Sequence, residues 1–543
     1  MQKLLLTTLS LLAIITGTFA QTQWANYWPL QQGAALDFSN GQPQLVQSCA
    51  LWSYEASGAI CDDEGQLQLY SNGGGRDSPF LPTGTIWNKN HEVLYDMGNT
   101  EGGGYSAKQG AIVIPAPGKP RHYYVLTMEE AESNAGGGVP GQAFGRGFSA
   151  FLVNMDANAG LGAVEQYLPM IYVPSYEAMC AIQHPNCRDY WVIIFDYNTS
   201  ELQVFPITPQ GIGAAQRYIF STPSGPIDIS GSEIRASPDA KHVYIGRFLF
   251  QFNSITGELS QLRRINLDLV HYEFSPGSRY LYSQMASEII RVDILAPDPT
   301  ATLEVIANIG DLGLGPRGPM QLGPEGSIWF RSSAPNSSSD YLHAIRQPDA
   351  LNPLVETQVL AIPISSQTPL LPDFPAQWFA TTPVTAPALD LGADLALCGD
   401  SMLLIPSGIV GFPVVWNTGD TLATLPVNTP GTYIATVFGC TTASDTIVVQ
   451  ENSCACPIQI PNAFTPNGDQ YNDTFGPASA PDGYTMRIWN RWGQMVFEYA
   501  GNGGPSTWDG TFKGQPAPSD VYVYQIVWEA CQKNESGDLT LLR

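Results

Sequence analysis

Short segments in which apolar and polar residues alternate recur along the chain. Two clear examples are MRIWNRWGQMVFE (486–498) and VYVYQIVW (521–528). A period of two places every second side chain on the same face, so the pattern predicts half-buried β-strands. Asn-Gly at 467–468 and Asp-Gly at 509–510 are typical of tight turns. The chain is therefore predicted to be all-β.

A weak repeat runs through residues 24–382. Each copy has a turn rich in Pro, Asp and Gly, followed by a short strand with a central aromatic residue. The copies are DDEGQLQLY (62–70), PGKPRHYYVLT (117–127), PNCRDYWVIIF (185–195), SPDAKHVYIG (237–246), SPGSRYLYS (275–283) and GPEGSIWF (323–330). Their aromatic anchors are Tyr70, Tyr124, Trp191, Tyr244, Tyr282 and Trp329, on average about 52 residues apart.

Repeats of this length with several short strands are typical of β-propeller blades. We expect a propeller over residues 21–385 with about seven blades, or six, one of them completed by both ends of the domain. In this interpretation the aromatic strand is the inner strand of its blade, and the polar turn lies at its entry. Closing the ring then protects the strand edges.

Composition narrows the class of protein further. The 543 residues include 53 Gly and 43 Pro, and only 13% are charged, about half of the ~25% typical of soluble proteins. With 44% hydrophobic residues, this indicates a folded, turn-rich chain rather than a disordered one. The net charge of −25 excludes a nucleic-acid partner, which needs clustered Lys and Arg. The acidic surplus fits solubility outside the cell, or divalent cations.

The first twenty residues, MQKLLLTTLSLLAIITGTFA, have the pattern of a secretory signal peptide. Lys3 precedes an apolar run that ends at Ile15, and Thr18 and Ala20 occupy the small-residue positions before a cleavage site. We expect cleavage after Ala20. The apolar run is shorter than the ~20 residues of a spanning helix, and no later stretch is long enough, so no membrane span is expected.

Residues 386–452 predict a small separate domain. They contain short strands, Trp416 between Cys398 and Cys440, and Tyr433 seven residues before Cys440. Such a pattern is typical of an Ig-like β-sandwich. It resembles the Ig-like or PKD-like modules that precede sorting domains in Bacteroidota. Gly399-Asp400-Ser401 matches the start of a lipase block only superficially, and we interpret the module as a spacer.

The last ninety residues contain four motifs. They are PNAFTPNGDQYNDTFGP from Pro461, RIWNRWGQMVFE from Arg487, WDGTFKGQPAPSDVYVYQIVW from Trp508, and the terminal GDLTLLR. In this order they resemble the type B sorting domain of Bacteroidota, also called the gliding-motility-associated C-terminal domain. The resemblance covers about residues 457–543 and predicts a small β-sandwich. It implies export by Sec, recognition by the type IX secretion machinery, and release or attachment at the cell surface.

The resemblance carries over to individual positions of these motifs. The candidate sorting residues are Pro461, Asn462, Phe464, Pro466, Asn467, Gly468, Asp469, Asn472, Asp473, Asn490, Arg491, Trp492, Gly493, Trp508, Asp509, Gly510, Tyr522 and Arg543. Asn467, Asp469 and Asp473 are spaced like oxygen ligands of Ca²⁺. Gln470 stands where the family usually has Gly, and no distal Glu follows, so a hydrogen-bonded Asx turn is the favoured alternative. No other cofactor is expected.

The chain has nine cysteines, and in an exported protein disulfides are the default. Sequence proximity predicts Cys49 with Cys61 and Cys180 with Cys187. Cys398 and Cys440 are the candidates of the middle domain. Cys454 or Cys456 is expected to pair with Cys531, which leaves one cysteine over. A metal site is not expected, because there is no CxxC pair and the six histidines are scattered.

The N-terminal region contains no recognised catalytic motif. There is no Gly-x-Ser-x-Gly elbow, and the pair His91–Glu92 does not extend to a zinc motif. His184 is expected to be structural rather than to point into a central channel. Carboxylates that could form a glycosidase pair are common in loops: Asp62, Asp63, Glu64, Glu129, Glu130 and Glu132. The run 128–142 predicts a surface loop.

We therefore expect an exported protein with a non-catalytic propeller that binds a glycan or protein. ALDFSNGQP (35–43), TIWNKNHEVL (85–94), QGAIVIPAPGKPRHYYVLT (109–127), RDYWVII (188–194) and LPDF (371–374) resemble propeller-like parts of type-IX-secreted proteins, which implies no activity. Trp52, Trp87 and Tyr105 are candidate aromatic contacts for carbohydrate. The alternatives are a secreted glycoside hydrolase or lyase on the same scaffold, and a structural surface or motility component.

Overall fold

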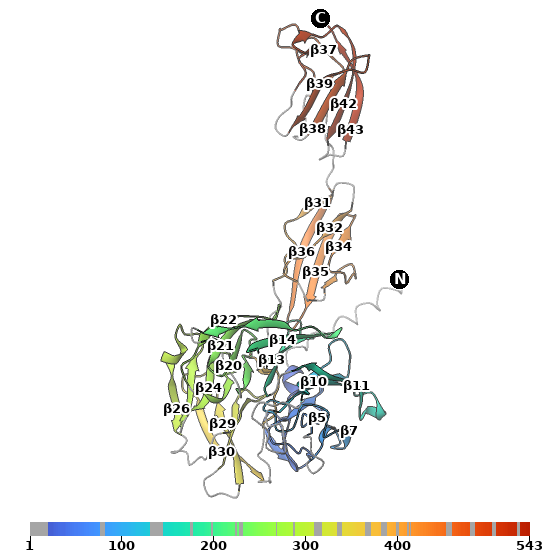
Figure 1. The fold of residues 1–543 in the computed structure, drawn as a ribbon. Helices are drawn as coiled ribbons and strands as arrows, with labels where there is room; N and C mark the ends of the chain where they lie inside the picture. Colours follow the sequence, from blue (N-terminus) through green and yellow to red (C-terminus); the bar gives the residue numbers. More distant parts are fainter. Residues whose placement is uncertain are drawn as a thin grey trace, which may run out of the picture. The chain divides into compact units, whose positions relative to one another are not determined.

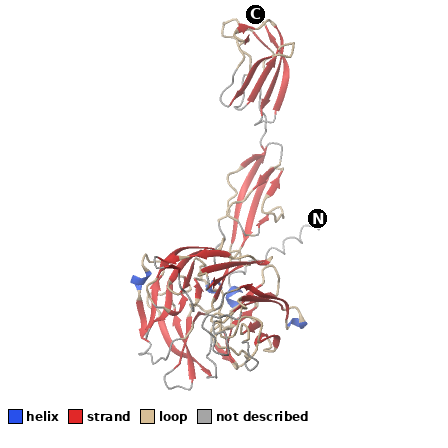
Figure 2. Ribbon diagram, in the orientation of Figure 1, coloured by secondary structure: helices blue, strands red, loops and turns tan. Residues whose placement is uncertain are grey.

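The repeated turns and aromatic strands form a succession of antiparallel sheets in a computed structural model of the chain. The structure describes residues 20–75, 82–130, 145–173, 177–196, 199–222, 225–226, 232–267, 269–285, 288–308, 318–333, 339–363, 371–381, 388–397, 401–409, 412, 414–451, 459–477, 484–501, 507–528 and 533–543. Strands dominate these residues, and the helices are single short turns (Figure 2). They are α1 (Ala20–Gln23) and the 3₁₀ turns η1 (Asn158–Gly160), η2 (Pro299–Thr302) and η3 (Ala376–Phe379).

Two compact units divide the chain. The first contains Met1–Asp390, Pro406–Ala423 and Ala435–Asp445, and the second contains Leu391–Ile405, Thr424–Ile434 and Thr446–Arg543. The expected boundaries at 385 and 457 remain predictions. Within the described ranges, no helix has the length and apolar character needed to cross a membrane.

Residues 27–363 of the first unit form sheets that follow one another in chain order around the unit (Figure 1). The first sheet has three strands: β1 (Tyr27–Gln31), β2 (Ala34–Asp37) and β3 (Gln44–Val46). The next are β4 (Gly58–Cys61), β5 (Leu67–Ser71), β6 (Gly84–Asn88) and β7 (Val93–Gly98), then β8 (Ala111–Pro115), β9 (His122–Met128), β10 (Phe148–Asn154) and β11 (Ala163–Tyr172).

The fourth sheet contains five strands, β12 (Met179–Gln183), β13 (Tyr190–Asp196), β14 (Glu201–Thr208), β15 (Gly211–Ile212) and β16 (Gln216–Ile219). A short pair, β17 (Ser221–Thr222) and β18 (Gly225–Pro226), follows it. The remaining sheets are β19 (Ile234–Ala236), β20 (His242–Ile245), β21 (Phe248–Asn253) and β22 (Glu258–Arg264); β23 (Val270–Phe274), β24 (Tyr280–Met285), β25 (Glu288–Asp293) and β26 (Glu304–Asn308); and β27 (Met320–Leu322), β28 (Ile328–Ser333), β29 (Ser339–Arg346) and β30 (Leu354–Pro363).

This arrangement is propeller-like, and it explains the sequence repeat. Each of the six repeated turns joins the first and second strands of a sheet, as 62–66 joins β4 to β5 and 237–241 joins β19 to β20. All six aromatic anchors are buried in the second strands β5, β9, β13, β20, β24 and β28. Each turn therefore lies where the first strand of its sheet ends and the second begins.

One expectation about the repeat is wrong. The aromatic strands are the second strands of their sheets, whereas the first strands of successive sheets contact one another: β4 with β8, β12 with β19, β19 with β23, and β23 with β27. The first strands therefore form the inner ring. They are short, and some, such as β8 (AIVIP), contain only apolar residues. The polar turn that identifies the second strands in the sequence does not precede them.

Residues 395–451 form two sheets. One has the order β31 (Leu395–Leu397), β36 (Thr442–Glu451), β35 (Gly431–Phe438), β33 (Val414–Trp416), and the other pairs β32 (Met402–Leu404) with β34 (Leu425–Val427). Trp416 is buried, and its indole N–H donates to the Leu422 carbonyl at 2.9 Å. The Tyr433 hydroxyl donates to the carbonyl of Thr429, four residues upstream, at 2.8 Å. A tyrosine bonded upstream in this way is found in Ig-like sandwiches.

The second unit ends in a five-stranded sheet with the order β37 (Ala463–Phe464), β43 (Lys533–Leu541), β42 (Asp520–Trp528), β38 (Tyr484–Trp489), β39 (Met495–Gly501). A small hairpin, β40 (Thr511–Phe512) and β41 (Gln515–Pro516), adjoins it in sequence. One face of the sheet buries a core rich in aromatic residues, among them Phe464, Phe475, Trp508, Tyr522 and Trp528. The alternating pattern at 484–489 is confirmed by the burial of Tyr484, Met486 and Ile488.

Candidate functional site

Residues 371–379 lie among the first strands of several sheets. Asp373 forms a parallel bridge with Ile112 of β8, and its amide donates to the Ser57 carbonyl at 3.1 Å. The Gln377 amide group accepts from the amide of Gln183, at the end of β12, and donates to Ser237, next to β19. The described residues of this segment thus contact first strands from across the unit. We call residues 371–379 the central segment.

A buried guanidinium fixes the central segment. Arg235 of β19 donates to Asp373 at 2.9 Å and to the Gln321 side chain at 3.2 Å. Glu233 and Glu273 lie 3.5 and 3.8 Å from the same guanidinium group. Four charged groups thus meet where the inner strands converge, and we call them the Arg235 cluster. The cavity left beside it is about 10 Å³, roughly the volume that a single water requires.

The three carboxyl groups of the Arg235 cluster differ in pKa, because they share a single arginine. Burial raises the pKa of Glu273 to about 7, and burial also raises the pKa of Asp373 to about 6. Burial acts in the same direction on Glu233, but the hydrogen bond with His271 and the charge of Arg235 lower the pKa of Glu233 to about 2. Glu233 therefore carries the negative charge, and a proton is held near Glu273.

This distribution predicts a pH dependence of stability. A carboxyl whose pKa is higher in the folded than in the unfolded protein binds more protons when folded, so its contribution falls as pH rises through that interval. For Glu273 the interval runs from about 4.5 to about 7. Wild type therefore loses this contribution as the pH rises from 5 to 8, whereas Glu273→Gln does not. The free energy of unfolding of Glu273→Gln minus that of wild type, measured with urea, is expected to be larger at pH 8 than at pH 5. An equal difference at both pH values contradicts the assignment, and Glu64→Gln, at an exposed site, is the control.

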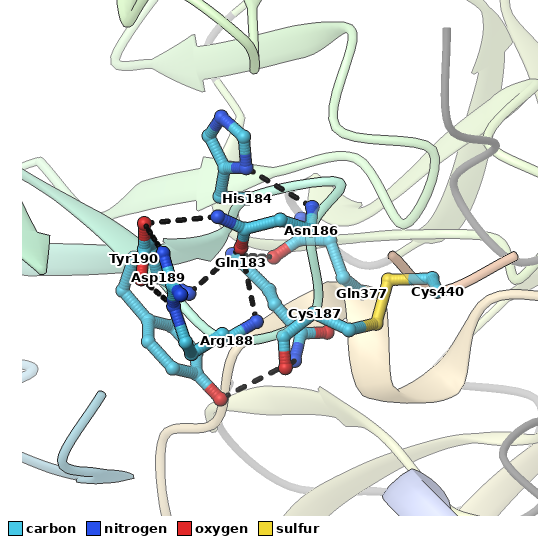
Figure 3. Close-up of a disulfide and its surroundings, with 9 residues drawn as sticks. All are labelled: Gln183, His184, Asn186, Cys187, Arg188, Asp189, Tyr190, Gln377 and Cys440. Atoms are coloured by element: carbon cyan, nitrogen blue, oxygen red, sulfur yellow. Dashed lines mark hydrogen bonds and ion pairs between the residues drawn. A yellow bond between two sulfur atoms is a disulfide. The ribbon is translucent and has the colours of Figure 1, made fainter. Parts of the chain in front are cut away.

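The turn 184–189 between β12 and β13 is held rigidly by its own side chains (Figure 3). Asn186 donates from its backbone to His184 Nδ1 at 3.0 Å and from its side chain to Asp189 at 2.9 Å. Burial lowers the pKa of His184, whose ring lies 5.4 Å from that of Phe412. His184 is thus a buried hydrogen-bonded residue of the turn, as expected.

A disulfide joins this turn to a segment far along the chain. Cys187 is bonded to Cys440, with Cα atoms 4.9 Å apart and 253 residues between them (Figure 3). Beside it the Cys440 amide donates to the Pro185 carbonyl at 2.9 Å. A side chain at Gly439 would lie only 2.3 Å from that carbonyl. All of these residues belong to the first compact unit.

The disulfides expected from proximity are wrong. Cys180 lies opposite Ile193 within the paired strands β12 and β13, whereas Cys187 lies in the turn beyond them. Cys49, Cys61 and Cys180 are buried free thiols, and burial raises the pKa of Cys49 to about 11 and of Cys180 to about 12. Because Cys440 pairs with Cys187, Cys398 is not its partner. Cys398, Cys454, Cys456 and Cys531 lie outside the described residues.

Peptide mapping without reduction tests the new pairing. We expect one disulfide-linked peptide pair that contains Cys187 and Cys440, and Cys180 recovered as a free thiol. Closing a loop of this length restricts the unfolded chain, so Cys440→Ser is expected to cost about 2–5 kcal/mol of stability. A peptide linking Cys180 to Cys187 would contradict the structure.

Two neighbouring hollows of the first unit are lined partly by repeated turns. One, of about 410 Å³, is lined by Trp24, the turn 62–64 and residues 119–123. The other, of about 330 Å³, is lined by Trp24, residues 115–120 and residues 187, 188 and 190. Three of the repeated turns line them, and Trp24 belongs to both. We call the pair the Trp24 groove.

The other sequence candidates in the described part of the chain are buried, except Trp52, which is half-buried. Glu129 and Glu130 are fully buried, and their side chains accept from the amides of Gly147 and Ser106. Trp87 stacks on Tyr70, with ring centres 5.3 Å apart. Trp52 packs edge-on against the buried Tyr105, with ring centres 4.8 Å apart. Glu132 lies outside the described residues.

The loop 467–473 of the second unit is a hydrogen-bonded turn. Both carboxylate oxygens of Asp473 accept backbone amides, from Asn467, Gly468 and Gln470 at 2.7–2.9 Å. These bonds lower the pKa of Asp473. Asp469 in turn accepts from the Asn467 side chain at 2.9 Å. Within the described ranges no three His, Cys, Asp or Glu side chains are placed to hold a metal ion, and the Ca²⁺ alternative stays a prediction.

Motifs from distant parts of the C-terminal sequence meet at one end of the sheet. Arg543 donates to the carbonyls of Ala517, at 3.1 Å, and Gly510, at 2.9 Å. Gly510 lies against Pro466, where an added side chain would come within 3.0 Å of the ring. Trp508 packs edge-on against Tyr522 at 4.9 Å.

The hairpin 490–493 exposes a large aromatic side chain. The Asn490 side chain accepts from the amides of Trp492 and Gln494 at 3.0 Å, which fixes the turn. Arg491 forms an ion pair with Asp520. Trp492 is 85% exposed. The remaining sorting candidates, Pro461, Asn462, Asn472, Gly493 and Asp509, lie in the loops and turns around this sheet.

Comparison with known families decides the nature of this C-terminal domain. Residues 458–541 match the model of the CHU_C Type IX secretion signal domain. The C-terminal domain is a CHU_C type IX secretion signal domain. The expected resemblance is thereby confirmed, and the CHU_C domain implies export by the type IX secretion machinery to the cell surface or the medium. No curated protein sequence matches the chain.

Solved structures similar to the chain include two from Bacteroides. A proposed 6-phosphogluconolactonase from Bacteroides fragilis has 11% identity and a TM-score of 0.39, over 64% of this chain and 97% of that chain. A second, from Bacteroides uniformis, has 13% identity and a TM-score of 0.30, over 55% and 96%. PorZ, a surface component of the type IX secretion system of Porphyromonas gingivalis, has 12% identity and a TM-score of 0.23, over 95% and 74%. Similarities this low carry no argument about activity.

Proposed function

We propose that this chain is an exported protein whose propeller-like domain binds a ligand at its surface and catalyses no reaction. The observation that carries the proposal is the central segment. It occupies the space between the first strands, and the cavity left beside the Arg235 cluster is about 10 Å³. An organic substrate needs a pocket of several hundred Å³, so the cavity that the described residues leave beside the Arg235 cluster offers no room for chemistry on one.

The buried charges at the centre also support a structural role for that region. Arg235 and Asp373 use each other as partners, and Glu273 accepts the backbone amide of Phe274 at 2.8 Å. Catalytic acids and bases must reach a substrate, whereas these groups are at least nine-tenths buried. Their shifted pKa values follow from burial within an ionic cluster, a situation that structural networks share with active sites.

We infer that the propeller has seven blades. The first would be β1–β3, and six sheets of four or five strands follow in the described residues, with the short pair β17–β18 between two of them. Phe374 of the central segment packs against Trp28 of β1 with ring centres 6.0 Å apart. This contact brings the C-terminal end of the domain to its first sheet, which agrees with a ring closed from both ends.

The proposed route of the protein begins at the N-terminus. Cleavage after Ala20 would leave a mature chain that starts at Gln21, and the CHU_C domain would direct it out of the periplasm. In the Ig-like interpretation, residues 386–452 form a spacer between the ligand-binding propeller-like domain and the CHU_C secretion domain. Attachment at the surface and release to the medium are both consistent with the domain.

The test uses the full mature chain with a panel of immobilised polysaccharides and mucins. Retention and released reducing ends are both measured. The proposal predicts retention on at least one material without product. Released product would establish an enzyme and overturn the proposal. The chain is also tested on an array of surface proteins. If it is not retained on any glycan or protein and releases no product, the result overturns the proposal and supports a structural component.

A further inference from the structure

The Trp24 groove contains an aromatic ring held in a fixed position. The Trp24 indole N–H donates to Asp63 at 2.7 Å, and the ring meets Trp378 of the central segment edge-on at 5.2 Å. The Trp24 carbonyl accepts the amide of Cys61 at 2.8 Å. Three constraints therefore position a half-buried ring that lines both hollows. Pre-positioning reduces the entropy lost when a ligand stacks on it.

Polar groups of both signs surround this ring. Asp63 and Glu64 are exposed on one side, and Lys119 is exposed on the other. Within the described residues, Glu64 and Lys119 have no ion-pair partner. Arg121 and His122 are already engaged, by Asp156 at 2.6 Å and by Glu165 at 3.4 Å. The groove therefore offers free acceptors, a free donor and an aromatic face.

We propose that the Trp24 groove is a binding site for a neutral oligosaccharide. This inference deepens the proposed function and rests on it. A pyranose ring has a face of C–H groups, which the electron-rich face of an indole attracts. Its hydroxyls donate to carboxylates such as Asp63 and Glu64 and accept from an ammonium such as Lys119. A strongly anionic polymer would meet the acidic turn and the net charge of −25, which disfavours it.

The position of the groove fits an extended chain of sugars rather than a single one. The two hollows share Trp24, Pro115, Lys119 and Pro120, so one ligand can pass over the ring from one to the other. The turns at 62–64, 117–121 and 185–189 come from three successive sheets. Each turn is closed by its own hydrogen bonds, for example Asp62 with the amides of Glu64 and Gln66, so the walls are formed before binding.

Calorimetry with the full mature chain tests the site. The probes are cellohexaose, xylohexaose, maltohexaose, laminarihexaose and mannohexaose, with decaproline and an oligolysine peptide as the peptide arm. We expect at least one hexasaccharide to bind, Trp24→Ala to weaken it at least tenfold, and Trp24→Phe to weaken it less. Glu64→Gln and Lys119→Gln, at exposed positions, are each expected to weaken it severalfold. They keep the test decisive if Trp24→Ala unfolds.

Matched controls separate this inference from the proposed function. Tyr471→Ala removes an exposed aromatic ring, 78% accessible, from the CHU_C domain, and Lys241→Gln removes an exposed lysine. Neither should change binding. If wild type binds an oligosaccharide and every groove variant binds equally well, the Trp24 groove is not the site while the proposed function stands. Binding of the peptides alone, or of none of these hexasaccharides, overturns the oligosaccharide assignment.

Discussion

Removal of residues 458–543 is expected to abolish export and leave the protein in the periplasm. The CHU_C domain occupies 458–541, and the last strand, β43, pairs with β37 on one side and with β42 on the other. The deletion therefore removes the whole folded signal. Immunoblots of periplasm, cell surface and medium measure the effect, with the exported fraction expected to fall to background.

A point variant and a control sharpen this experiment. Trp508 is fully buried in the core of the CHU_C domain, and Trp→Ala at such a site costs about 3–5 kcal/mol. Trp508→Ala is therefore expected to reduce export as the deletion does, whereas Tyr471→Ala, at an exposed position, should not unfold the domain. Appearance of the truncated chain outside the periplasm would contradict the role of the domain.

Replacing Arg235 by methionine is expected to lower the free energy of unfolding of the propeller-like domain by about 3–5 kcal/mol. The arginine is the cation of a buried cluster, and its removal leaves Glu233, Glu273 and Asp373 without it. The hydrogen bond from Arg235 of β19 to Asp373 is lost as well. Because Glu273 and Asp373 take up protons on acidification, the loss should be smaller at pH 5 than at pH 8.

The control for this variant is another arginine paired with a carboxylate. Arg121 lies 2.6 Å from Asp156, and the two side chains are 43% and 61% exposed. Solvent screens such a pair, so Arg121→Met should cost much less than Arg235→Met. Urea unfolding followed by tryptophan fluorescence measures both. Equal losses for the two variants would show that Arg235 does not fix the central segment.

The turn repeat was readable from sequence because the same local chemistry recurs in each sheet. Turns such as 237–241 and 275–279 use Ser side chains at the same positions: Ser237 and Ser275 each accept the amide five residues later. Local patterns of this kind predict an element and its neighbour. They do not say which strand lies innermost, because the first strands, such as β19 (IRA), are too short to show a period.

The long-range features were not predictable in the same way. Sequence spacing cannot determine disulfide connectivity, and the Cys187–Cys440 bond spans 253 residues. Nothing in the sequence around Asp373 or Arg235 marks them as partners, and only the fold places their side chains 2.9 Å apart. The sequence does not single out Trp24, because it lies close to the predicted signal peptide and in none of the repeats.

Hydrogen exchange of the full mature chain tests the central claim that the protein's own chain seals its propeller-like domain. The amide of Asp373 is bonded to Ser57, and that of Trp378 to Pro375, within a buried segment. The account predicts that peptides covering 371–379 exchange as slowly as those of the inner strands β8 and β12, since protection follows local stability. Exchange at the rate of exposed turns such as 62–66 would show an open centre and contradict the account.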